Sequence, residues 1–62
     1  MYKVSLYFDR NIDGESFVYF PKVRDVTTDM EGYITVTFMK NHKSHYVSFR
    51  EDYVLKIKTV HL

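Results

Sequence analysis

The sequence predicts an all-β domain, either a small barrel or a strongly coiled antiparallel sheet, with five or six short strands. Residues 33–40 and 45–50 alternate inward and outward side chains and are rich in Val, Ile, Thr, Tyr and Phe, which is typical of strands. No window of about eleven residues repeats its apolar side chains at the helical period of 3.6. The 62 residues are expected to form one domain, residues 1–62.

The first strand is predicted at residues 2–8. Every second side chain of this segment is apolar and is expected to face the core: Tyr2, Val4, Leu6 and Phe8. Residues 9–16 are polar and are expected to form a loop, with Asp13-Gly14 as its turn.

The second strand is predicted to begin at residues 17–20, where apolar side chains occupy both faces. Both faces of such a segment must be covered, one by the core and the other by a loop or a second subunit. Pro21 has no N–H to donate, so it marks an edge, a kink or a bulge. Val23 and Val26 then break the period of two, which also predicts a bulge or bend.

Residues 29–32 are predicted to form a turn in which Gly32 takes a positive φ. The strands at 33–40 and 45–50 are expected to be joined by a turn at residues 41–44. Their core-facing side chains should be Ile34, Val36, Phe38, Val47 and Phe49.

Residues 50–52 are a short connection that suits one 3₁₀ turn. The last strand is predicted at 53–61, with Leu55 and Ile57 facing the core. Apolar side chains beyond Thr59 are out of phase, so we expect either a bulge near Thr59 or a tail that lies against another surface.

Two segments resemble SH3-like barrels. Leu6-Tyr7-Phe8-Asp9 is similar to their first strand, and residues 49–55 are similar to their final 3₁₀ turn and strand. The resemblance implies an SH3-like barrel. Peptide-binding SH3 domains use a tryptophan in the binding groove, and this chain has none, so recognition of proline-rich ligands does not follow.

Composition restricts the class of protein. A chain of this length buries only about 60 % of its unfolded surface. It has no cysteine for disulfides, so a homodimer is expected as readily as a monomer. The lack of cysteine, of a signal peptide and of a long apolar segment predicts a stand-alone cytoplasmic protein.

Charge is small overall and unevenly distributed. The formal net charge of +1 argues against a protein whose main task is to wrap nucleic acid. Residues 1–32 hold four Lys or Arg against six Asp or Glu, whereas residues 33–62 hold five against two. Opposite potentials on two faces would orient a partner, and ordinary solubilising charge is the alternative.

One loop motif has the spacing of calcium ligands. Asp9, Asn11, Asp13 and Gly14 match the first half of an EF-hand loop, D-x-N-x-D-G. The twelfth position is Phe20 instead of a bidentate Glu, and strands are predicted on both sides, which excludes an EF-hand. A weak calcium site on residues 9–15 and a simple hairpin turn remain the two alternatives.

No catalytic or cofactor site is expected. His42 and His45 have H-x-x-H spacing, but no cysteine or nearby carboxylate completes a zinc site. The chain has no cysteine nucleophile, no strand-to-helix elbow around a serine and only two glycines, too few for a phosphate loop. We therefore predict a protein that is not an enzyme and has no cofactor, and apart from the calcium alternative at residues 9–15 we expect no metal site.

The expected function is recognition of a partner through an aromatic and basic sheet face. Its contacts should come from the strands at 33–50 and their turn: Tyr33, Met39, Lys40, His42, Lys43, His45, Tyr46 and Arg50. Outward Tyr, Met and Arg are typical of the centre of protein interfaces, so the first hypothesis is an accessory or inhibitory protein, of the kind that phages and mobile elements encode.

Two alternatives remain. Single-stranded nucleic acid could stack on the same rings and bind the same cations. A small anionic ligand could be held in a cleft between subunits. No membrane partner is expected.

Overall fold

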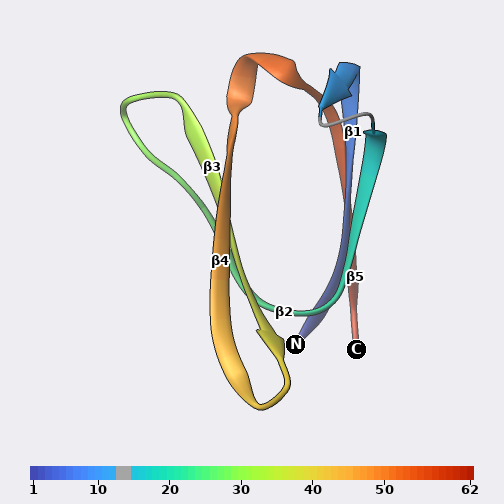
Figure 1. The fold of residues 1–62 in the computed structure, drawn as a ribbon, viewed down its shortest axis with the longest axis vertical. Coiled ribbons are helices and arrows are strands. Elements are labelled where there is room, and N and C mark those ends of the chain that lie inside the picture. The colour runs from blue at the N-terminus through green and yellow to red at the C-terminus, as the bar shows by residue number, and fades with distance from the viewer. Residues whose placement is uncertain (13–14) are drawn as a thin grey trace.

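Five antiparallel strands form one sheet in the computed structural model, in the spatial order β4-β3-β2-β1-β5 (Figure 1). The elements along the chain are β1 (Tyr2–Ile12), β2 (Glu15–Thr28), β3 (Tyr33–Lys40), β4 (Lys43–Arg50), the 3₁₀ turn η1 (Glu51–Tyr53) and β5 (Val54–His61). The structure describes residues 1–12 and 15–62, and the side chains outside residues 10–15. The all-β prediction is confirmed, and so is the 3₁₀ turn before the last strand.

The central strand β2 is bent. Its first half pairs with β1 and its second half pairs with β3. Between Phe20 and Val23 it has one residue more than β1, and between Val23 and Asp25 it has one residue more than β3. Pro21 lies in the first of these bulges, where a residue without N–H is tolerated. The predicted bulge after residue 20 is confirmed, and Figure 1 shows β2 turning there between the two arms of the sheet.

The hydrophobic core lies between the two arms. Its buried side chains alternate along β1 and β3 and lie on both sides of the bulge in β2: Val4, Leu6, Phe8, Phe20, Val23, Ile34 and Val36. Phe38, Val47 and Phe49 pack against them half-buried, as the alternation predicts. The prediction that Tyr2 faces the core is wrong: it is 37 % exposed at the start of β1, where its ring packs edge-on against His61 and not against the core cluster. We call the side of the sheet that faces this core the inner face, and the opposite side the outer face.

The sheet is not closed into a barrel, because β4 and β5 are its two edges. Closure would require these strands to pair with each other, and each instead pairs with one neighbour, β3 or β1. Of the two predicted forms, the closed barrel is therefore wrong, and the chain forms one open antiparallel sheet. The open sheet is bent over its own core by the bulges of β2.

The bulge in β5 lies at Leu55 and not near Thr59. Tyr7 pairs with Lys56 and Phe8 with Val54, so Leu55 is the additional residue. Leu55 is 71 % exposed and Val54 packs against the core in its place. The prediction that Leu55 faces the core is wrong, because one added residue reverses the faces of a strand.

The predicted loop at 9–16 is wrong over most of its length. β1 continues to Ile12 and β2 begins at Glu15, and these two residues pair with each other. The β1–β2 ladder is irregular between these pairs, because β1 has four residues and β2 has one between Tyr7–Phe17 and Ile12–Glu15. The predicted turn residues Asp13 and Gly14 lie outside the described residues.

The turn between β2 and β3 is confirmed and is stabilised by an aspartate. The Asp29 Oδ1 atom accepts hydrogen bonds from the N–H groups of Glu31 (2.9 Å) and Tyr33 (3.0 Å). Gly32 has a φ of 89°. A side chain at this φ would be strained, so glycine is the suitable residue.

The turn between β3 and β4 has two residues and not four. Asn41 and His42 have φ values of 53° and 62°, and Lys40 pairs directly with Lys43. Two successive positive φ angles are typical of a type I′ hairpin turn, whose twist matches that of the flanking strands. Asn accepts this conformation well, whereas His accepts it at some cost.

Replacing His42 by glycine should stabilise the fold. Asn-Gly is the preferred type I′ pair, so His42→Gly should raise the free energy of unfolding by about 0.5 kcal/mol. Urea denaturation followed by far-UV circular dichroism measures the change. A lower free energy of unfolding in His42→Gly would contradict the turn assignment.

Candidate functional site

Four of the predicted contact residues lie together on the outer face of the β3–β4 hairpin. Tyr33 pairs with Arg50, while Met39 and Tyr46 occupy positions of the same parity farther along the hairpin. The Arg50 guanidinium carbon lies 6.0 Å from the centre of the Tyr33 ring. Tyr46 is 77 % exposed. All four residues have the outer parity that the alternation predicts, and Met39 is half-buried there.

The other four predicted residues do not join them. Lys40, Lys43 and His45 occupy the inner parity of the same strands, and His42 is in the turn. The His45 ring stacks on Phe38, with ring centres 5.6 Å apart. The eight residues therefore belong to two sides of one hairpin. Residues that are close in the sequence need not share a face, because adjacent residues of a strand point to opposite sides of the sheet.

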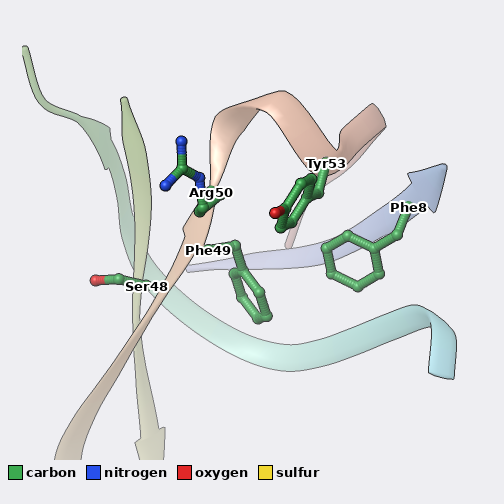
Figure 2. Close-up of a pocket in the computed structure, with 5 residues that line it drawn as sticks. All are labelled: Phe8, Ser48, Phe49, Arg50 and Tyr53. Carbon is green, nitrogen blue, oxygen red and sulfur yellow. The ribbon is translucent and has the colours of Figure 1, made fainter. Parts of the chain in front are cut away.

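A small pocket opens at the end of the core near η1, and Figure 2 shows its lining. Phe8 and Phe49 form its apolar wall with ring centres 5.3 Å apart, and Tyr53 and Arg50 complete it. The Ser48 side chain points away from these rings in Figure 2, and its hydroxyl hydrogen-bonds to that of Thr35 at 2.8 Å. At about 170 Å³ this pocket is smaller than typical ligand pockets, and it has no catalytic pair.

A second outer face was not predicted as a site, and it is formed by β1, the first half of β2, and β5. We name it the aromatic–lysine face, and its members are Lys3, Tyr7, Phe17, Tyr19, Lys56 and Lys58. Tyr7 pairs with Phe17 on one side and with Lys56 on the other. In the next row, Ser5 pairs with Tyr19 and Lys58. Register therefore places aromatic rings on β2 beside lysines on β5.

The geometry of the first row is close. The rings of Tyr7 and Phe17 have centres 4.9 Å apart and are tilted by 43°. On the other side, the Lys56 ammonium nitrogen lies 4.6 Å from the centre of the Tyr7 ring, which is within range of a cation–π interaction. Ring, ring and cation thus form a continuous line across three strands.

The segment 17–20 is covered on one side only. Val18 and Phe20 pack toward the core, whereas Phe17 and Tyr19 are 41 % and 45 % exposed on the outer face. Of the two predicted covers for the second side, a loop is not found among the described residues, and a second subunit stays a prediction. Aromatic side chains that share one exposed face are typical of binding surfaces, where Tyr and Phe are enriched.

The aromatic–lysine face is locally basic although the chain is nearly neutral. Its paired positions from residues 3–7, 17–19 and 56–60 include three lysines and no carboxylate. Alternation within each strand places Tyr7 on β1, and Lys56 and Lys58 on β5, opposite core-facing neighbours. Only the register of β1 against β2 and β5 shows that they meet Phe17 and Tyr19.

Within the part of the chain that the structure describes, no group of three or more His, Cys, Asp or Glu is arranged to hold a metal ion. The calcium motif at 9–15 falls largely outside the described side chains. No helix among the described residues has the length and apolar character needed to cross a membrane.

Comparison with protein-family models, with curated proteins and with solved structures finds no match to this chain.

Proposed function

We propose that this protein is a non-enzymatic binding module for single-stranded nucleic acid, and that the strand lies on the aromatic–lysine face. The observation that carries the proposal is the row in which Tyr7 contacts the Phe17 ring on one side and the Lys56 ammonium on the other. Proteins that bind single-stranded nucleic acid combine aromatic rings, on which bases stack, with cations that follow the phosphates. The short 3₁₀ turn before β5 fits the SH3-like resemblance, which we retain as part of the proposal without barrel closure.

The spacing of the Phe17 and Tyr19 rings suits the unstacked bases of a single strand. Phe17 and Tyr19 are two residues apart on one face, which separates their side chains by about 6.8 Å along β2. This is twice the rise of about 3.4 Å per base in a stacked strand. A single strand would therefore place successive bases on successive rings, instead of on one another.

The lysines supply the electrostatic part. Lys56 and Lys58 lie on β5, two strands away from the rings of Phe17 and Tyr19 on β2. Lys3 lies on β1, the strand between β5 and β2. If the phosphates of the strand follow the lysines of β5, its bases can reach the aromatic rings of β2. A net charge of +1 suits a strand bound on one basic face better than nucleic acid wrapped around the whole protein.

Fluorescence anisotropy with a labelled oligo-dT tests the proposal. We expect binding at low salt, with log affinity falling against log salt at a slope of roughly −1.4 to −2.1 if two or three lysines neutralise phosphates. A duplex of the same length should bind more weakly, because its bases are not free to stack on protein rings. Absence of binding in about 50 mM salt, or binding that salt does not change, would disprove the proposal.

A second candidate is recognition of a protein partner through the outer face of the β3–β4 hairpin. It is favoured by the 77 % exposure of Tyr46 on the face that also carries Tyr33 and Arg50, because Tyr and Arg are enriched at interface centres. Tyr46→Ala should abolish capture of such a partner and leave oligonucleotide binding unchanged. A loss of both activities in this variant would mean that the two faces do not act separately.

A further inference from the structure

A cleft lies in the bend of β2, next to the end of β3. We name it the elbow cleft, and its lining is Tyr19, Phe20, Pro21, Phe38, Met39 and Lys40. Its volume is about 420 Å³, within the range of pockets that hold small organic ligands. An adjoining hollow of about 370 Å³ shares Met39 and Lys40 and extends to Lys22 and His42. Figure 1 shows that the bend of β2 and the β3–β4 turn lie at the same end of the molecule.

The bulge at Pro21 explains why the cleft exists. β2 pairs in register with β1 up to Phe20, and after the bulge Val23 pairs with both Tyr2 of β1 and Phe38 of β3. Beyond Val23 it pairs with β3 alone, so the two arms diverge at this point. The rings of Phe20 and Phe38, with centres 4.9 Å apart, form an apolar floor between the arms. A substituent that enters the cleft meets aromatic and thioether surface at its base.

The cleft is continuous with the aromatic–lysine face through Tyr19, which belongs to both. Its other wall carries Lys40, and the adjoining hollow adds Lys22. No carboxylate lines either space among the described residues. Apolar floor, aromatic wall and cationic rim are together complementary to a nucleobase attached to a phosphate.

We infer that the elbow cleft binds one unpaired base of the strand that crosses the aromatic–lysine face. This inference rests on the proposed function and adds a path for the strand, from Phe17 over Tyr19 and into the cleft. The base lies between Tyr19 and Met39, and Lys40 and Lys22 neutralise its neighbouring phosphates. The cleft, unlike the open face, is bounded on several sides, so it is where one base would be distinguished from another.

The test is a series of labelled oligo-dT strands of increasing length, titrated by anisotropy against the wild type, Met39→Ala and Lys40→Gln. Short strands fill the aromatic–lysine face alone and should bind all three proteins equally. Strands long enough to reach the cleft should bind the wild type about tenfold more tightly than short ones, the gain expected of one further stacked base. Met39→Ala and Lys40→Gln should lose most of that gain.

Met30→Ala is the matched control, because Met30 is fully exposed in the turn between β2 and β3. It should retain the full gain with length. Thermal melts of each variant verify that half-buried Met39 can be shortened without unfolding the domain.

The outcomes separate the two claims. If short strands bind and the length gain survives in both Met39→Ala and Lys40→Gln, the cleft inference is overturned and the proposed function stands. If the wild type binds no strand of any length, both are overturned. A strand with one abasic position gives a second readout: affinity should fall most when the missing base is the one assigned to the cleft, and equal losses at every position would refute the assignment.

Discussion

The double substitution Phe17→Ala and Tyr19→Ala should weaken binding of single-stranded oligonucleotides by at least roughly 30-fold. Each base–ring contact contributes about 1–3 kcal/mol by alanine substitution, and this variant removes two rings of the aromatic–lysine face. The slope of affinity against salt should stay close to that of the wild type, because all three lysines remain. Anisotropy titrations at several salt concentrations measure both quantities.

Two controls make the result specific. Tyr46→Ala removes the most exposed tyrosine, on the β3–β4 hairpin, and should leave oligonucleotide affinity within about twofold. Lys56→Gln with Lys58→Gln should reduce the salt slope by roughly 1.4, because two phosphates lose their cations. Equal losses in the Tyr46→Ala variant and the Phe17/Tyr19 double variant would show that rings act non-specifically, and the aromatic–lysine face would have no special role.

Replacing Leu6 by alanine should destabilise the domain more than any surface change. Leu6 is completely buried at the centre of the core, and such truncations cost about 2–5 kcal/mol. A domain of this length has a total stability of roughly 3–9 kcal/mol, so the variant retains little of it. The melting temperature should fall by roughly 10 to 40 °C, measured by calorimetry or circular dichroism.

Leu55→Ala is the matched control, since it removes the same atoms from an exposed position. Leu55 is 71 % exposed at the bulge of β5, so its truncation should change the free energy of unfolding by less than about 0.5 kcal/mol. The pair also tests the register of β5 against β1. A large loss of stability in Leu55→Ala would place Leu55 in the core, as the strand's alternation alone predicts.

The all-β class, the bounds of β3, the turn at 29–32 and the bulge at Pro21 were predictable from the sequence. Each depends on residues that are neighbours in the chain. Alternation within residues 33–40 decides which side chains share a face, Gly32 permits a positive φ, and Pro21 lacks a donor. These properties hold in any fold that contains the segment.

The aromatic–lysine face could not be found in the same way. Tyr7, Phe17 and Lys56 are far apart in the chain, and their contact requires the registers of β1 with β2 and of β1 with β5 together. The sequence instead favoured residues 33–50, where aromatic and basic side chains are close along the chain. Half of that predicted set points to the inner side or lies in the turn, because adjacent residues of a strand face opposite ways.

The sequence by itself determined that this chain forms strands, and which residues of β3, and of β1 after Tyr2, face the core, because a period of two is a local property of the backbone. Only the tertiary structure decided that the sheet stays open, that Leu55 is exposed, and that rings of β2 meet lysines of β5. Those outcomes depend on register, and one added residue in β2 or β5 changes which side chains share a surface.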